Sequence, residues 1–182
     1  MRKLFNLTSV ASGIAVGMIV AGILAIVGGG YAHKIVRDQL VPQKIYFSDN
    51  AKELPANLKP YAGQQVDTAK EAKVFADDYI GLHLQGIANG QTYSEVSGQF
   101  MKDPKNTQLA QQRQSLFMGE TLRGLLLSAW GWGTIATIAT IAGIVLTAIG
   151  TILLIVPVMA LIGERRRNTT PAARPATPNA AA

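Results

Sequence analysis

Two long stretches of this chain carry no charged side chain, and they restrict it to folds with helices in a membrane. Leu4 to Ala32 contains no Asp, Glu, Lys or Arg, and neither does Gly124 to Gly163. Each is longer than the roughly 20 apolar residues that a helix needs to cross about 30 Å of hydrocarbon. The sequence therefore predicts an all-α membrane protein with transmembrane helices near residues 8–30 and 134–158 and a soluble segment between them.

The distribution of positive charge predicts how such a chain is oriented. Residues 34–123 hold eleven basic and ten acidic side chains, so the net charge of +6 lies almost wholly outside this segment. The surplus cations are Arg2, Lys3, Arg165, Arg166, Arg167 and Arg174. Basic residues that flank membrane spans stay on the cytoplasmic side. We expect a multi-pass protein of the cytoplasmic membrane, a hairpin with both termini cytoplasmic and an extracytoplasmic central domain. A nucleic-acid partner is disfavoured, because it would require a basic stripe on the folded part.

The first apolar stretch has two interpretations. Small residues at Gly30 and Ala32 precede His33, as a signal peptidase would require. The apolar run is longer than the usual 7–15 residues of a signal core, however. We expect it to be retained as a span, with cleavage as the alternative.

The second apolar stretch fits one crossing rather than two. Its forty residues would form a helix about 60 Å long, twice the hydrocarbon thickness. A third crossing would place one of the basic ends outside. We therefore expect a helix that begins before the bilayer, crosses at about 134–158 and stops at the arginines from Arg165 to Arg167. Trp130, Trp132 and, on the first stretch, Tyr31 are predicted interfacial anchors, because amphipathic aromatic rings prefer the membrane surface.

The soluble segment is predicted to be small and mostly helical. Thr68 with Glu71 and Thr92 with Glu95 have the spacing of capping boxes, which mark helix starts. The pair Asn89-Gly90 is typical of a helix end. Further expectations are a helix start at Asp103-Pro104 that runs into the second crossing, and a short strand over residues 43–48.

These signals divide the chain into four parts. We expect a short cytoplasmic N-terminus and first transmembrane helix (1–33), an extracytoplasmic helical domain (34–104) and a long helix continuing into the second span (105–163). The remaining residues, 164–182, combine Arg, Pro and Ala without large apolar groups, which predicts a disordered cytoplasmic tail.

Small residues recur along both apolar stretches. Gly13 and Gly17 form a GxxxG pair that Ala21 and Ala25 extend, and the second stretch offers Ala139, Gly143, Thr147 and Thr151. Such rows let helix backbones approach closely in lipid. We expect them to pack either against each other within the chain, or against other membrane proteins or a second copy.

No chemistry-bearing motif is present. The chain has no cysteine and only two histidines, and neither a P-loop, a dinucleotide fingerprint nor a nucleophile elbow occurs. His83 and Asp78 are five apart on a helix, so a metal site formed with Asp77 and His33 is disfavoured. We expect no catalytic, cofactor-binding or metal-ligating residues.

Five short segments of the chain are distinctive: residues 54–58 (LPANL), 61–66 (YAGQQV), 78–84 (DYIGLHL), 91–97 (QTYSEVS) and 117–127 (FMGETLRGLLL). Together they resemble an uncharacterised family of small actinobacterial membrane proteins with two spans and an extracytoplasmic loop. Members of that family are often labelled aromatic ring-opening dioxygenases, but no residues here support that label. The resemblance implies a cell-envelope location, the two-span topology and the organism group, without implying a reaction.

Together these patterns favour a non-enzymatic accessory or scaffold protein that docks on a larger membrane complex. The alternative is a membrane-anchored extracytoplasmic ligand-binding or sensor module. Either would have the lipid bilayer as its first partner.

Overall fold

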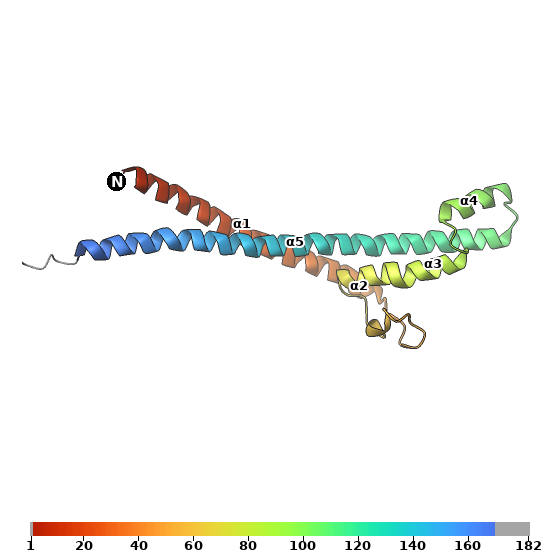
Figure 1. Cartoon of the computed structure of the whole chain (residues 1–182). Helices are drawn as coiled ribbons and strands as arrows, with labels where there is room; N and C mark the ends of the chain where they lie inside the picture. Colours follow the sequence, from red (N-terminus) through yellow and green to blue (C-terminus); the bar gives the residue numbers. More distant parts are fainter. Residues whose placement is uncertain (1, 170–182) are drawn as a thin grey trace, which may run out of the picture. The chain divides into compact units, whose positions relative to one another are not determined.

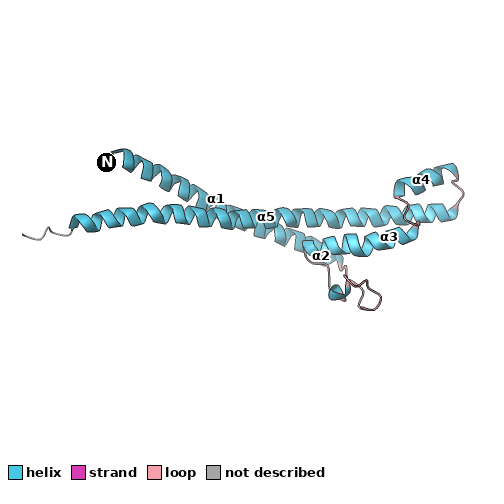
Figure 2. Ribbon diagram, in the orientation of Figure 1, coloured by secondary structure: helices cyan, strands magenta, loops and turns pink. Residues whose placement is uncertain are grey.

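The computed structural model describes residues 2–169, and it is helical without a strand in that range (Figures 1 and 2). In chain order the elements are α1 (Arg2–Leu40), the 3₁₀ turns η1 (Val41–Gln43) and η2 (Lys59–Tyr61), α2 (Ala69–Val74), the π-helix η3 (Phe75–Ile80), α3 (Gly81–Ile87), α4 (Tyr93–Lys102) and α5 (Thr107–Thr169). By length and composition, α1 and α5 could each span a membrane. The all-helical architecture with two such helices is thus confirmed.

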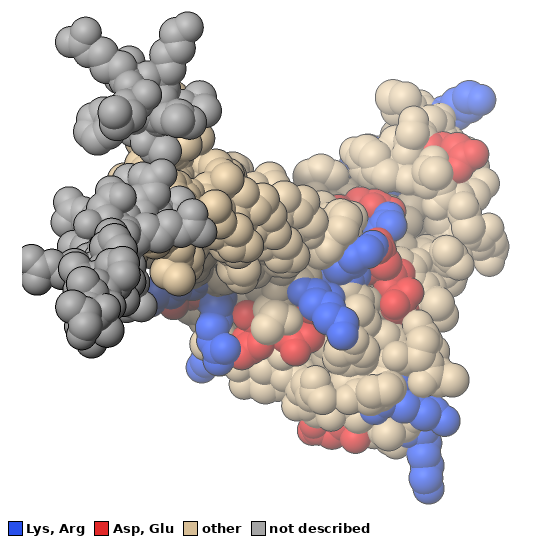
Figure 3. All heavy atoms as spheres, turned by 60° about the vertical axis from the view of Figure 1, so that its left-hand side comes forward, with Lys and Arg blue, Asp and Glu red and all other residues tan. Residues whose placement is uncertain are grey.

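The chain divides into two compact units, to which α1 and α5 both contribute. Unit 1 comprises Met1–Leu24 and Ala142–Ala182, and unit 2 comprises Ala25–Ile141. Every charged residue from Lys34 to Arg123 falls in unit 2. On the face that Figure 3 shows, cations and anions mix rather than separate by sign, as expected for a nearly neutral domain.

In unit 1, α1 and α5 run antiparallel with their backbones in contact. A Cβ atom added at Gly22 would lie 2.6 Å from the carbonyl oxygen of Gly143. One added at Gly150 would lie 2.8 Å from the carbonyl oxygen of Ala15. All four residues are buried. Glycine is therefore required at both glycine positions for the two helices to approach this closely.

In unit 2, the second half of α1 continues the same kind of contact with the middle of α5. A Cβ atom added at Gly29 would lie 2.7 Å from the carbonyl oxygen of Ala136 and would also meet the Thr140 hydroxyl. Nearby, His33 Nε2 and Thr137 Oγ1 are 3.2 Å apart within hydrogen-bonding distance. Small residues thus set the spacing of the two helices here as well.

A further helix, formed by α2, η3 and α3 in succession, also runs antiparallel to α5 in unit 2. Its start lies where Ala69 faces Gly133, and its end lies where Leu84 faces Gly119. A Cβ at either glycine would overlap the facing side chain. The amide of Gly81 donates to the carbonyl of Ala76, the five-residue spacing that defines a π turn.

The predicted caps of this helix and of α4 are confirmed. Thr68 Oγ1 accepts the amide of Glu71, whose carboxylate accepts the amide of Thr68 in return. The Thr92 and Glu95 pair has the same reciprocal bonds. The end of α3 at Ile87 is followed by Asn89 and Gly90 with φ of 53° and 79°, the left-handed conformation predicted for a helix stop.

After α4 the chain doubles back onto the first turns of α5 (Figure 1). The guanidinium carbon of Arg113 lies 4.1 Å from the centre of the Phe100 ring, and the Tyr93 and Phe117 rings are 5.7 Å apart. These contacts between α4 and α5 keep the short helix in place.

The predicted start of the last helix at Asp103-Pro104 is wrong. Asp103 instead ends α4, since its amide donates to the carbonyl of Gln99. The residues after it form a turn, and Asn106 begins α5 by accepting the amide of Leu109 at 3.1 Å. From there α5 continues without a break for 63 residues, about 95 Å at 1.5 Å per residue.

The connection between α1 and α2 folds over an aromatic cluster. Phe47 is 1 % exposed and lies within 5.2 Å of the Tyr61 ring and 5.0 Å of the Phe75 ring, centre to centre. The strand predicted over residues 43–48 is absent. Only an isolated bridge between Tyr46 and Gln65 forms, because Lys44 adopts a left-handed φ of 52° and interrupts the extended run.

Candidate functional site: an apolar cleft between α1 and α5

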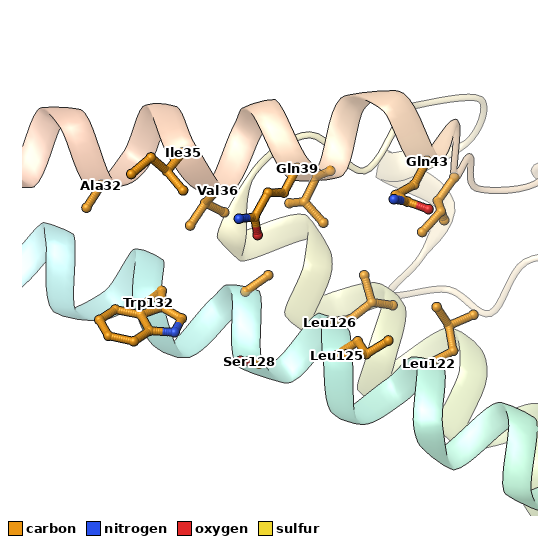
Figure 4. Close-up of a pocket in the computed structure, with 13 residues that line it drawn as sticks. Ala32, Ile35, Val36, Gln39, Gln43, Leu122, Leu125, Leu126, Ser128 and Trp132 are labelled. Atoms are coloured by element: carbon orange, nitrogen blue, oxygen red, sulfur yellow. The ribbon is translucent and has the colours of Figure 1, made fainter.

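Unit 2 contains a cleft of about 630 Å³ between the end of α1 and the middle of α5. Figure 4 shows side chains of the two helices facing one another across it. Its lining residues are Ala32, Ile35, Val36, Gln39, Leu40, Gln43, Ile45, Leu122, Leu125, Leu126, Ser128, Ala129 and Trp132. None of these thirteen side chains is charged, so the cleft suits an apolar occupant with a few polar atoms.

The base of the cleft is the hydrophobic core of unit 2. Val36, Leu40 and Leu126 are each at most 6 % exposed and belong to the same buried cluster as Phe47 and Phe75. The rim is open to the surroundings, with Leu125 65 % and Trp132 62 % exposed. A buried apolar base below an open apolar rim is the usual form of a binding groove.

The cleft lies at the edge of both uncharged stretches. Ala32 is the last residue of the first stretch, and Leu125 is the second residue of the other. Polar lining groups come from Gln39 and Gln43, beyond the first stretch, and from Ser128. The cleft is therefore placed where apolar helix surface gives way to the charged domain.

Beside the cleft, a group of charges joins η3 to α5. Asp77 accepts from Lys73 and, at 3.1 Å, from Arg123, which also pairs with Glu120. The Lys73 hydrogen bond, reinforced by that of Arg123, outweighs partial burial and lowers the pKa of the Asp77 carboxyl. Asp77 therefore stays ionised and ties the π-helix to α5.

Lys73 also lies 4.8 Å above the centre of the Trp130 ring. A cation over an indole face is attracted to it, which helps hold Trp130 against α2. Trp130 is consequently less exposed than Trp132, at 38 %.

A smaller cleft of about 310 Å³ contains the residues considered for a metal site. Asp78 and His83 line it together with Glu53, Tyr79 and others. His83 Nδ1 donates to the carbonyl of Tyr79 at 2.7 Å, which occupies one ring nitrogen. Within the part of the chain that the structure describes, no three His, Cys, Asp or Glu residues are grouped to hold a metal ion. His33 lies elsewhere, against Thr137.

The structure distributes the predicted helix-packing residues unevenly. Gly143 lies in the contact between α1 and α5 in unit 1. Gly13 and Gly17 have nothing within 4 Å of a Cβ placed on them, and Ala21 is exposed. Gly13, Gly17 and Ala21 therefore do not form this intramolecular contact, and their use against another helix stays a prediction.

The predicted anchors and topology charges are placed as follows. Tyr31 is 66 % exposed, and Trp132, on the rim of the cleft, is similarly open. Arg2, Lys3, Arg165, Arg166 and Arg167 lie within α1 and α5 by sequence. Of the predicted disordered tail, residues 164–169 belong to α5, and residues 170–182 lie outside the described residues.

Of the glycines in the contact between α1 and α5, the sequence pattern identified Gly143 but not Gly22, Gly29 or Gly150. Ala15, Gly22 and Gly29 are seven apart, as are Ala136, Gly143 and Gly150. A seven-residue repeat of small side chains is the pattern of closely packed, left-handed helix pairs. That period, rather than the four-residue spacing of GxxxG, would have identified them.

Comparisons of the chain with protein-family models, with curated proteins and with solved structures found no match. The resemblance to the actinobacterial two-span family therefore stays an expectation.

Proposed function

We propose that this chain is a non-enzymatic accessory or scaffold protein of the cell envelope that docks on a larger membrane complex. In this proposal α1 and α5 hold it in the cytoplasmic membrane with the central domain outside, as in the family that it resembles. Support comes from apolar surface that lipid would not cover.

Four large apolar side chains on α4 and the first turns of α5 are exposed: Tyr93, Met101, Phe117 and Met118. We call them the distal apolar residues. Met101 is 73 % and Phe117 57 % exposed. Tyr93 and Met101 lie on α4, and Phe117 and Met118 precede Glu120 and Arg123 on α5. All four are outside the uncharged stretch, where the bilayer would not reach them. Exposed apolar surface of this kind marks protein interaction sites, and this observation carries the proposal.

The test is affinity purification of the tagged full-length protein from its own membranes in mild detergent. The changed protein carries Phe117→Ser and Met118→Ser. A matched control carries Gln111→Ser and Gln114→Ser, two exposed polar positions on the preceding turns of α5. We expect wild type and control to retain one defined, stoichiometric set of membrane proteins, and the changed protein to lose it at least about tenfold. Circular dichroism establishes that all three are equally helical.

Recovery of the chain alone, or equal retention by the Phe117 and Met118 variant, would overturn docking through this surface. Recovery as a homo-oligomer would identify the partner as a second copy and remove the larger complex from the proposal.

The second candidate is a membrane-anchored ligand-binding or sensor module. The observation that favours it is the apolar cleft, which has the volume of a small-molecule site.

A further inference from the structure

We propose that the cleft between α1 and α5 in unit 2 binds the acyl chain of a membrane lipid. This inference supplies a ligand class for the second candidate function, and it does not depend on docking through the distal apolar residues.

The length of the cleft fits an extended hydrocarbon chain. Along α5 it runs from Leu122 to Trp132, which is about 15 Å at 1.5 Å per residue. An acyl chain is thin and can lie in the cleft lengthwise.

The chemistry of the walls fits hydrocarbon. Aliphatic side chains and the Trp132 indole supply most of the lining, and the base is already dry core. An uncovered groove of this kind would hold water against apolar surface, which is unfavourable. A lipid tail removes that surface from water without requiring hydrogen bonds from the walls.

The position of the cleft identifies where the occupant comes from. One end of the cleft, at Ala32 and Trp132, belongs to the uncharged stretches, and Trp132 is a predicted interfacial residue. Its other end carries the Gln39 and Gln43 side chains, whose amides can donate to the ester or head-group oxygens of a lipid. A lipid can therefore enter from the bilayer with its tail toward Trp132 and its polar part toward the glutamines.

The first test fills the cleft. Ser128→Phe and Ala32→Phe each place a ring in the lining, whereas Ile138→Phe changes an outward-facing residue of α5 that is 61 % exposed. Full-length proteins purified in detergent are compared by native mass spectrometry. We expect wild type and Ile138→Phe to retain one phospholipid per chain, and the filled variants to lose it at least about fivefold. Absence of a retained lipid in wild type, or equal retention by the filled variants, would overturn the proposal.

A second test needs no substitution in the cleft. Wild-type protein is reconstituted in phosphatidylglycerol vesicles that contain a trace of the same lipid with a photoactivatable diazirine in its acyl chain. Before irradiation, the freely accessible lipid is exchanged for unlabelled lipid. We expect labelling to concentrate on residues 35–43 and 122–132 and to remain after this exchange. Labelling of these residues that is no stronger than labelling of Ile138 would contradict a bound lipid. So would a loss of labelling after exchange that is equal at these residues and at Ile138.

The two proposals fail separately. Loss of lipid retention in the filled variants, with their protein partners unchanged, would support the lipid site independently of docking. Loss of partners in the Phe117 and Met118 variant would not contradict the lipid site.

Discussion

At the scale of single residues, Asp77 is the side chain through which η3 forms an ion pair with Arg123 of α5. Its carboxylate forms ion pairs with both Lys73 and Arg123. We expect Asp77→Asn to lower the free energy of unfolding at pH 7 by about 1 kcal/mol, since the pairs are only partly buried and solvent screens them. Urea unfolding of the full-length protein in detergent micelles measures the change.

The neighbouring Asp78 is the matched control, because it forms no ion pair with another described residue. Asp78→Asn should leave stability unchanged within about 0.5 kcal/mol. Equal effects of the two substitutions would show that loss of a negative charge on this helix, and not loss of the ion pairs, changes the free energy of unfolding.

The lowered pKa of Asp77 gives the same comparison a pH dependence. A carboxyl with a depressed folded pKa contributes stability above its unfolded pKa, about 3.9, and loses it as the pH falls through the folded value. The stability difference between wild type and Asp77→Asn should therefore be constant near neutrality and shrink below about pH 4. A difference that persists unchanged into acid would contradict an ionic origin.

At the scale of elements, the helix caps were predictable from sequence because they are local. Thr68 and Glu71 satisfy each other's amides within one turn, whatever the rest of the chain does. The π turn in η3 and the start of α5 were not predictable in this way. Asp103 and Asn106 both have cap-forming side chains, and the position of α4 against α5 decides which of them begins the helix.

Gly28 and Gly29 on α1 are adjacent in sequence but differ in their contacts with α5. A Cβ at Gly29 would meet Ala136 and Thr140, whereas nothing lies within 4 Å of a Cβ at Gly28. We expect Gly29→Ile to cost about 1–3 kcal/mol by forcing α1 and α5 apart, and Gly28→Ile to be nearly neutral. Thermal unfolding in micelles together with hydrogen exchange of residues 25–40 measures both.

Equal tolerance of the two substitutions would mean that α1 and α5 do not pack closely at this level. Faster hydrogen exchange of residues 25–40 in Gly29→Ile, but not in Gly28→Ile, would establish which of these residues contact α5.

At the scale of the whole molecule, the sequence predicts the class of protein better than its binding surface. The uncharged stretches alone indicate two long apolar helices, because a helix that crosses lipid needs about 20 predominantly apolar residues. The cleft depends on which residues of α1 face which residues of α5, and that register is set by contacts between residues about a hundred positions apart, such as Gly29 with Ala136. Leu122 and Gln39 carry no local signal that they line one cavity.

Membrane topology is the property of the whole chain that the charges predict and that labelling can test. The chain has no cysteine, so single-cysteine variants report without background. In intact cells stripped of their outer wall, a membrane-impermeant maleimide should label Ser94→Cys on α4. It should reach Thr177→Cys only after the membrane is permeabilised. The expected contrast follows from the arginines at 165–167, since carrying each charge against a potential of 100 mV costs about 2.3 kcal/mol.

Peptide mass spectrometry of the same purified proteins tests whether the first span is retained. Retention predicts that residues before His33 remain in the chain, and cleavage predicts that they are missing while Ser94→Cys is still labelled. Labelling of Thr177→Cys in unpermeabilised cells would contradict the cytoplasmic C-terminus. It would also place the lipid cleft and the distal apolar residues in the cytoplasm if Ser94→Cys were then protected. The side on which unit 2 lies therefore decides which leaflet supplies the lipid and which complexes are within reach, so this experiment precedes the search for either.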